Sequence, residues 1–215
     1  MRFRVGMSVP QSQYYQYMRE RGFDVEPVEM LRNDEQETME KMRGFDAIVA
    51  MGELFNARVL DALKDDLKII VRHGIGYDRV DIDYAAKLGI CCCNTPGTMS
   101  SGVAETTITM MLECTRGFYK RERDMKEGKW NRGPVTSQLE GTTVGLVGFG
   151  SIGQRVAQYL SGFNCRILAN DVHYNEDALK TLHVEKSSMD RIAAESDFVS
   201  IHVLQHPRYH VKRRR

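Results

Sequence analysis

Short apolar segments alternate with amphipathic segments along nearly the whole chain, and this alternation restricts the fold more than any other feature. A strand followed by a helix and a second strand returns to the same sheet by a right-handed crossover, which makes neighbouring strands parallel. We therefore predict an α/β protein built on parallel sheets. Strands are predicted at residues 3–7, 24–28, 46–50, 67–71, 90–94, 143–147, 166–170 and 198–203. Helices are predicted at residues 11–21, 34–43, 56–64, 82–87, 103–124, 152–163 and 176–181.

A break in this pattern divides the chain into two domains. Asn94-Thr95-Pro96-Gly97 is the strongest turn signal in the first 130 residues, and the longest helical pattern begins shortly after it. We predict one domain over residues 1–100 and a second over residues 101–203. Residues 204–215 form a separate basic tail with five Lys and Arg residues and no acid.

The most specific motif lies in the second domain. Gly148, Gly150 and Gly153 form G-x-G-x-x-G, with an apolar strand before them and an amphipathic helix after them. In this context the first glycine permits a tight turn, the second lets the backbone approach a pyrophosphate, and the third allows close packing of helix and strand. The free N–H groups at the start of the helix then face the phosphates. The motif predicts a dinucleotide-binding site.

An acidic residue follows this motif at the expected place. Asp171 ends the next predicted strand, eighteen residues beyond Gly153, where a carboxylate accepts hydrogen bonds from the adenosine ribose. The carboxylate would repel a 2′-phosphate, and no arginine follows closely in the sequence. The spacing therefore favours NAD over NADP.

A second glycine-containing loop follows the predicted strand 67–71. Arg72-His73-Gly74-Ile75-Gly76 places two glycines at the carboxyl end of a strand, where backbone amides can turn outward toward an anion such as a carboxylate. A plain tight turn would have the same sequence pattern, so the residues alone leave both interpretations open.

Charge and cysteine content exclude several classes of protein. Without the tail, the chain carries 25 basic and 29 acidic residues, so its body is mildly acidic and offers no basic face for nucleic acid. The apolar runs are far too short to span a membrane. Cys91, Cys92 and Cys93 would alternate between the two faces of a strand and cannot all meet one partner. We interpret the five cysteines as small apolar fillers in a reducing cytoplasm, and we predict no metal site.

Taken in order, the motifs resemble those of the D-isomer-specific 2-hydroxyacid dehydrogenase family, which includes phosphoglycerate dehydrogenases and glyoxylate/hydroxypyruvate reductases. The resemblance covers about residues 1–203. It rests on the loop at residues 72–81, Asn94-Thr95-Pro96-Gly97, Val103-Ala104-Glu105, Gly128-Lys129-Trp130, the glycine motif and the segment at residues 196–203.

The resemblance implies a flavodoxin-like substrate domain followed by a Rossmann domain, and a small 2-hydroxyacid or 2-oxoacid as substrate. Arg72, His73, Gly74, Ile75 and Gly76 would hold the substrate carboxylate. Ser151 and Ile152 would cover the NAD pyrophosphate, Asp171 would hold the ribose, and His202 with Val203 would border the cofactor. The long helix and the arm after it would build a homodimer.

The resemblance ends at Val203. The catalytic Arg, Glu and His of the family have no matching position in this sequence, and only the first half of a Rossmann sheet is represented. We expect this chain to be a truncated or frameshifted form of an oxidoreductase, inactive or nearly so by itself. The alternative is a non-catalytic module that binds NAD(H) and dimerises.

Overall fold

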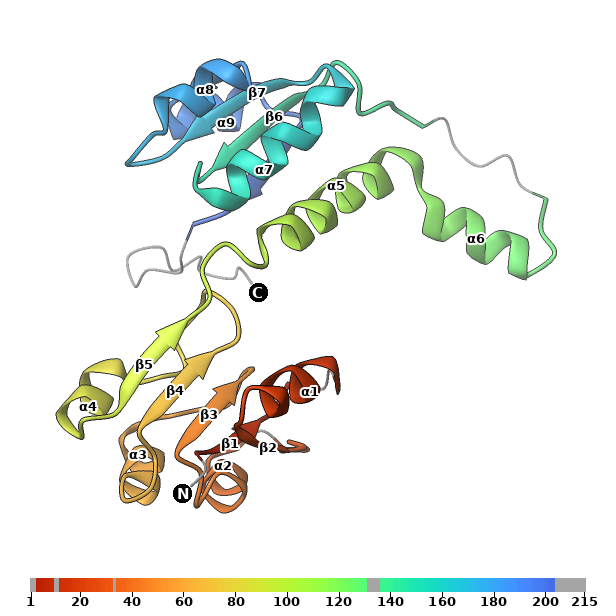
Figure 1. Ribbon diagram of the computed structural model, residues 1–215. Coiled ribbons are helices and arrows are strands. Elements are labelled where there is room, and N and C mark those ends of the chain that lie inside the picture. The colour runs from red at the N-terminus through yellow and green to blue at the C-terminus, as the bar shows by residue number, and fades with distance from the viewer. Residues whose placement is uncertain (1–2, 10–11, 33, 131–135, 204–215) are drawn as a thin grey trace. The chain divides into compact units, whose positions relative to one another are not determined.

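The computed structural model describes residues 3–9, 12–32, 34–130 and 136–203, and the chain divides into two compact units, Met1–Thr98 and Met99–Arg215 (Figure 1). Both units are α/β and contain only parallel strand pairs within the described residues, which confirms the predicted fold class. The domain limits predicted from the sequence, 1–100 and 101–203, stay predictions about folding units. The predicted basic tail, 204–215, lies outside the described residues.

The first unit contains a five-stranded sheet in the order β2-β1-β3-β4-β5. This is the flavodoxin-like strand order, which reverses direction between β1 and β3. The strands are β1 (Arg4–Met7), β2 (Asp24–Pro27), β3 (Ala47–Ala50), β4 (Ile69–Arg72) and β5 (Cys91–Asn94).

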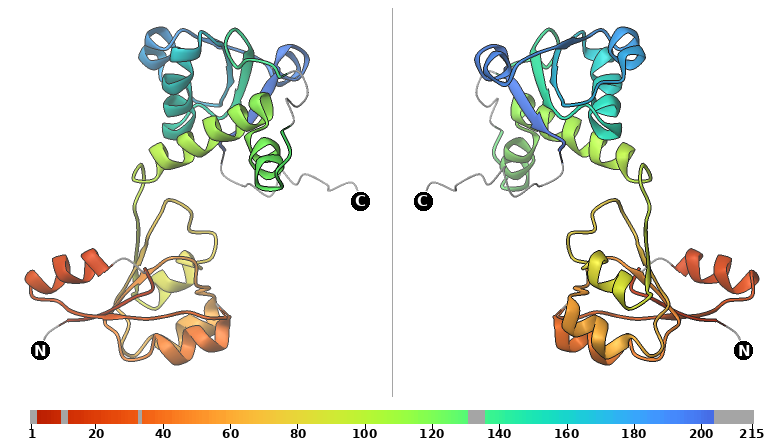
Figure 2. Two further views of the ribbon diagram at one scale, coloured as in Figure 1. Left: turned by 90° about the vertical axis from the view of Figure 1, so that its right-hand side faces the viewer. Right: turned by 90° about the vertical axis from the view of Figure 1, so that its left-hand side faces the viewer.

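Helices cover both faces of this sheet (Figure 2). On one face, α1 (Ser12–Glu20) packs Tyr15 and Met18 against a cluster that contains Val5, Met7 and Val25. On the other face, a larger cluster joins the sheet to the three remaining helices of the unit. These are α2 (Glu35–Lys41), α3 (Ala57–Leu63) and α4 (Ile82–Lys87), and Asp34, Asn56 and Asp81 cap them by accepting backbone N–H bonds.

The second unit contains a four-stranded sheet in the order β8-β7-β6-β9, the order expected for the first strands of a Rossmann domain. Its strands are β6 (Thr143–Val147), β7 (Arg166–Asn170), β8 (Val184–Lys186) and β9 (Phe198–Ile201). Its helices are α5 (Ser100–Arg116), α6 (Phe118–Lys126), α7 (Ser151–Leu160), the short 3₁₀ helix Ser161–Phe163, α8 (Glu176–Thr181) and α9 (Met189–Glu195).

The two faces of the second sheet are packed differently. Val144 and Leu146 of β6 share one buried cluster with α5, α7 and α8. On the opposite face, α9 lies so close that a Cβ at Gly145 would be 2.5 Å from Ile192 Cγ2. Only glycine lets α9 approach the strand this closely.

Three details of the predicted elements are wrong. The helix predicted at 103–124 is two helices, because Gly117 adopts φ 60° and ends α5 before α6 begins. β8 and α9 lie outside the predicted elements, because both are short and contribute few buried side chains. The predicted strand 198–203 ends at Ile201.

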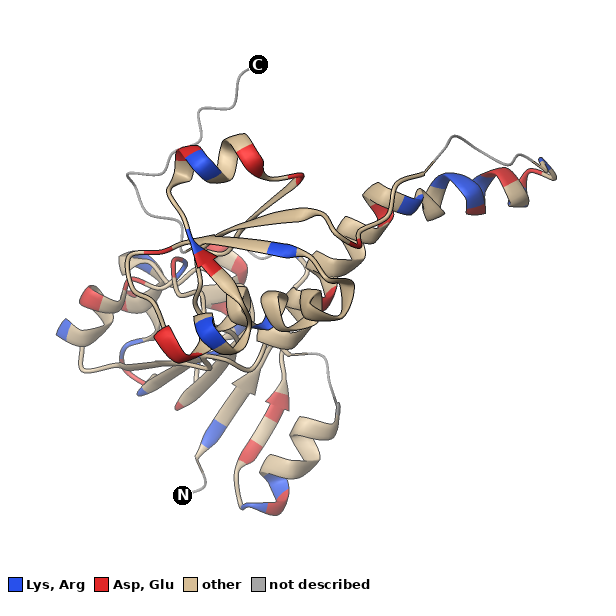
Figure 3. Ribbon diagram, turned by 90° about the horizontal axis from the view of Figure 1, so that it is seen from above, with Lys and Arg blue, Asp and Glu red and all other residues tan. Residues whose placement is uncertain are grey.

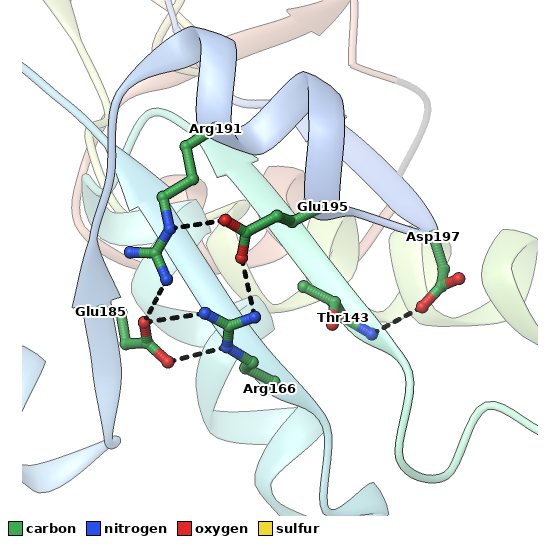
Figure 4. A network of polar contacts seen from close by, with 6 residues as sticks. All are labelled: Thr143, Arg166, Glu185, Arg191, Glu195 and Asp197. Atoms are coloured by element: carbon green, nitrogen blue, oxygen red, sulfur yellow. Dashed lines mark hydrogen bonds and ion pairs between the residues drawn. The ribbon is translucent and has the colours of Figure 1, made fainter.

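Charged side chains hold the amino end of this second sheet together (Figure 4). Arg166, the first residue of β7, contacts Glu185 of β8 at 2.8 Å and Glu195 of α9 at 2.8 Å. Arg191 contacts the same two carboxylates, at 3.0 and 2.9 Å. The two arginines lower the pKa of Glu185 to about 2. We call these four residues the ionic network.

The outer surface mixes both signs of charge, as the bands along α6 illustrate (Figure 3). Within the described ranges, we find no helix that is long and apolar enough to cross a bilayer.

Candidate functional site

The turn between β6 and α7, residues 148–153, is shaped by backbone contacts that leave no room for side chains at two of its glycines. Gly148 adopts φ +102°, and a Cβ there would lie 2.7 Å from the His202 carbonyl oxygen. A Cβ at Gly153 would lie 2.3 Å from the Gly148 carbonyl oxygen. The first and third glycines of the motif are therefore required by the fold itself. We call residues 148–153 the glycine turn.

The middle glycine of the turn faces open space. A Cβ at Gly150 would meet no atom within 4 Å, and its φ of −75° is accessible to any residue. Gly150 is also the N-cap residue of α7, and it supplies no side-chain hydrogen bond to the first turn of the helix. The N–H groups at the start of α7 thus keep their donor capacity, and the positive end of the helix dipole lies with them. This arrangement suits an anionic group that approaches the backbone closely.

Ser151 begins α7 and contacts a residue that the sequence analysis did not select. Its Oγ lies 3.1 Å from the Oγ of Ser100, a buried residue at the start of α5. The two hydroxyls bring the amino ends of α5 and α7 together. Nothing in the spacing of the sequence signals this contact, because the two serines lie 51 positions apart. Ile152, beside Ser151, is partly buried and packs against the core cluster of the sheet.

Asp171 follows β7 and is joined to the glycine turn. Its Oδ2 accepts the Phe149 N–H at 2.5 Å, and its Oδ1 accepts the His173 N–H at 3.1 Å. Burial raises the pKa of the carboxyl group, but the N–H bonds from Phe149, His173 and Val172 together outweigh burial, so the pKa lies below its ordinary value. Asp171 is thus an anion at neutral pH. Its two oxygens retain lone pairs that can accept further hydrogen bonds.

Residues 202 and 203 border the glycine turn on the β9 side. The His202 N–H donates to the Val147 carbonyl at 2.7 Å, and its ring Nε2 lies 2.9 Å from Ser200 Oγ. Burial lowers the pKa of His202, so its ring is neutral at pH 7. A Cβ at Gly148 would also lie 3.0 Å from Val203 Cγ1. The structure therefore brings the predicted cofactor residues of this unit together at the carboxyl ends of β6, β7 and β9.

The loop at residues 72–76 lies in the first unit, at the carboxyl end of β4. Arg72 turns its guanidinium back onto the loop, where Nη1 donates to the His73 carbonyl. The His73 N–H donates to the Ala50 carbonyl at 2.8 Å, and the His73 ring lies 6.1 Å from that of Tyr14. We call residues 72–76 the Arg72 loop.

Two residues at the end of β5 fix the shape of the Arg72 loop, and the sequence analysis did not assign them this role. The Gly74 N–H donates to Thr95 Oγ1 at 2.8 Å, and the Thr95 N–H donates to the Gly74 carbonyl at 3.1 Å. Asn94 Nδ2 donates to the Ile75 carbonyl at 3.0 Å. In the part of the chain that the structure describes, the N–H groups of Ile75 and Gly76 donate to no protein acceptor. These two groups are the loop's available backbone donors for an anion.

The chain matches a known protein family and several curated proteins. Residues 108–211 match the NAD binding domain of the D-isomer specific 2-hydroxyacid dehydrogenases. The chain is 39% identical over 157 residues to a hydroxypyruvate reductase from Thermotoga maritima, a match that spans 73% of this chain and 50% of that protein. It is 34% identical over 183 residues to a glyoxylate reductase from Thermococcus onnurineus, across 80% of this chain and 54% of the relative. The chain thus spans about half the length of the curated relatives it matches.

Solved structures give the same likeness over nearly the whole chain. The apo structure of D-lactate dehydrogenase from Escherichia coli matches with a TM-score of 0.82 and 28% identity, over 95% of this chain and 66% of that one. The TT0316 protein from Thermus thermophilus matches with a TM-score of 0.85 and 27% identity, over 96% of this chain and 67% of that one.

Proposed function

The chain belongs to the D-isomer-specific 2-hydroxyacid dehydrogenase family, whose NAD binding domain matches residues 108–211, and from this premise we propose a function for each of its two sites. The whole protein interconverts a small D-2-hydroxyacid and the corresponding 2-oxoacid, with NAD as the hydride carrier. Within it, the glycine turn and Asp171 hold the ADP-ribosyl part of NAD, and the Arg72 loop holds the substrate carboxylate.

The observation that carries this proposal is the open space at Gly150 beside an uncapped helix. The glycine turn is closed at Gly148 and Gly153, where neighbouring backbone occupies the position of a side chain. It is open only at the glycine that adjoins the first turn of α7. A pyrophosphate seated there accepts the N–H groups of α7 and is stabilised by the helix dipole.

Asp171 supplies the selectivity for the nucleotide. Its carboxylate is ionised and is oriented by the Phe149 and His173 N–H groups, so its remaining lone pairs can accept both ribose hydroxyls. A 2′-phosphate would place a second anion against this carboxylate, in a place where the next residues, Val172, His173 and Tyr174, include no arginine or lysine. We therefore propose that NAD binds in preference to NADP.

In the Arg72 loop, the N–H groups of Ile75 and Gly76, which donate to no acceptor among the described residues, are the proposed donors to the substrate carboxylate. Gly74 contributes through its backbone shape, because its φ is +134° and its own N–H donates to Thr95. Arg72 and His73 stabilise the loop and add a cation and an imidazole to its surroundings.

Hydride transfer also requires a base and a cation on the reacting oxygens. Because no residue of this sequence matches the family's catalytic Arg, Glu and His, we expect the 215-residue chain, assayed alone, to bind nucleotide without appreciable turnover.

Calorimetric titration with NAD, ADP-ribose, ADP and NADP tests the nucleotide assignment. We expect ADP-ribose and ADP to bind nearly as well as NAD, because the described contacts are all on the ADP-ribosyl side, and we expect NADP to bind clearly less well. Asp171→Ala should weaken NAD binding and narrow the gap to NADP, whereas Glu185→Gln, in the ionic network at the other end of the sheet, should leave both unchanged. Equal affinities for NAD and NADP in the wild-type chain would contradict the role of Asp171.

We further propose that the protein is a cytoplasmic homodimer joined through α5 and α6. The support is a set of exposed apolar side chains along these helices and just beyond them: Met110, Phe118, Tyr119, Met125 and Trp130. The same set favours the second candidate function, a non-catalytic NAD(H)-binding module that acts through dimerisation. Light scattering on the eluted chain tests the dimer, which both candidates require. An assay with NADH and glyoxylate, hydroxypyruvate or pyruvate separates the candidates, because turnover would exclude the non-catalytic module.

A further inference from the structure

The three consecutive cysteines of β5 do not all behave as small core residues. Cys92 is half-buried and packs against the core cluster on the α2–α4 face of the sheet. Cys91 and Cys93 are both exposed, and they lie on the opposite face because successive side chains of a strand alternate. β5 is hydrogen-bonded only to β4 within the described sheet, so the two thiols lie on an edge strand. The interpretation of these cysteines as apolar fillers therefore accounts for Cys92 alone.

We propose that Cys91 and Cys93 form a dithiol site that binds a thiophilic divalent cation such as Zn²⁺ or Cd²⁺. Their Sγ atoms lie 3.9 Å apart and contact one another. A tetrahedral ion with sulfur bonds of about 2.3 Å holds two thiolates about 3.8 Å apart. An ion can therefore bridge the pair with almost no movement of the strand.

The same geometry opposes the other reaction open to two neighbouring thiols, which is disulfide formation. Residues two positions apart on a strand have Cα atoms about 6.7 Å apart and Cβ atoms that point the same way. A disulfide requires Cβ atoms about 3.8 Å apart, so β5 would have to distort to form one. Cys91 and Cys93 are spaced for a bridging ion and not for a covalent bond.

The surroundings of the pair favour a soft ion over a hard one. Ile69 and Val71 of β4 stand in register beside Cys91 and Cys93 and provide no oxygen ligands from their side chains. Among the described residues, no group of three or more His, Cys, Asp or Glu side chains is placed to hold a metal ion. The two sulfurs are thus the protein's contribution, and water completes the coordination. Each thiol loses its proton to solvent when the ion binds. Thiolates with no carboxylate beside them select zinc-like ions over Mg²⁺ or Ca²⁺.

Titration of the full chain with Cd²⁺, followed by the ultraviolet absorbance of the sulfur–cadmium bond, tests this proposal. The chain is kept reduced with a phosphine, which offers no competing thiol. We expect one ion per chain, competition by Zn²⁺, and no absorbance change with Mg²⁺. Cys91→Ser and Cys93→Ser should each weaken Cd²⁺ binding by on the order of tenfold or more, because each removes one of two sulfur ligands.

Cys114→Ser provides the matched control, because Cys114 is also exposed but lies on α5 of the second unit, whereas Cys91 and Cys93 belong to the first. This variant should bind Cd²⁺ with unchanged affinity. Since all three substitutions are at exposed positions, circular dichroism should show the same fold in each variant. The proposal is overturned if either Cys91→Ser or Cys93→Ser retains the wild-type affinity, or if Cys114→Ser loses as much affinity as they do.

Discussion

The glycine turn and the Arg72 loop both follow a parallel strand and both depend on glycine, but different parts of the chain hold them in shape. In the glycine turn, the constraint is the packing of backbone against backbone, at Gly148 beside His202 and at Gly153 beside Gly148. In the Arg72 loop, side chains from the end of the neighbouring strand, Thr95 and Asn94, hold the backbone through hydrogen bonds. The glycine turn therefore tolerates no side chain at Gly148 or Gly153. The Arg72 loop can be weakened gradually, by removing one hydrogen bond at a time.

The largest loss of stability is expected from a side chain added at a glycine that lies against neighbouring backbone. Gly153→Ala would place a Cβ 2.3 Å from the Gly148 carbonyl oxygen, and neither backbone segment can move without disturbing β6 or α7. We expect the free energy of unfolding of the second unit to fall by about 3 kcal/mol. Urea unfolding monitored by circular dichroism measures this change. A loss below about 1 kcal/mol would show that the turn can adapt, and the contrast with the Arg72 loop would then fail.

The matched substitution at the open glycine separates binding from folding. Gly150→Ala adds the same methyl group where no atom lies within 4 Å, so the fold should lose less than about 1 kcal/mol, the cost of a poorer N-cap residue. NAD affinity should nevertheless fall by roughly tenfold or more, about 1.4 kcal/mol, because the Cβ occupies the approach of the pyrophosphate. Calorimetry and urea unfolding on the same preparation measure both quantities. Unchanged NAD affinity would contradict the proposed seat.

A smaller effect is expected in the Arg72 loop. Thr95→Val removes the hydroxyl that accepts the Gly74 N–H and should lower the stability of the first unit by about 1 kcal/mol. Thr95→Ser keeps the hydroxyl and serves as the control. Hydrogen exchange at the Gly74 amide should accelerate in the valine variant only. If the serine variant exchanges as fast as the valine variant, the hydroxyl by itself is not sufficient to hold the loop.

The smallest effect concerns the ionic network at the opposite end of the second sheet. The pKa of Glu185 is about 2, below that of an ordinary glutamate, so its ion pairs stabilise the folded chain above about pH 4.5 and lose their effect as the pH falls toward 2. Because these side chains are half exposed, solvent screening limits the contribution to about 1 kcal/mol or less. Glu185→Gln should therefore unfold slightly more readily than wild type at pH 7, and this difference should shrink as the pH falls through 2. A difference that does not shrink over this range would point to packing instead of charge.

The sequence located both glycine-containing turns because their glycines and flanking strands are local patterns, whereas their roles in binding stay predictions. Each glycine of the turn was located from spacing alone, but the atoms that exclude a side chain at Gly148 belong to His202, 54 positions later, and only the fold brings them together. The contacts of Ser100 with Ser151 and of Thr95 with Gly74 are long-range in the same way. Gly117 carried a usable signal, but the apolar stripe continued through it and masked the break between α5 and α6.

The hydrogen bond between Asp171 and Phe149 makes one carboxylate common to the proposed nucleotide site and the fold around it. Its Oδ2 joins the end of β7 to the glycine turn, so any ligand that engages Asp171 also stabilises the turn in its folded shape. By thermodynamic linkage, a nucleotide present at a hundred times its dissociation constant adds about 2.7 kcal/mol to the folded state that binds it. That gain belongs to the unit that contains the turn and not to the one that contains the Arg72 loop. If the proposed site binds nucleotide, the second unit should melt at a higher temperature in its presence, whereas the melting of the first unit should not change.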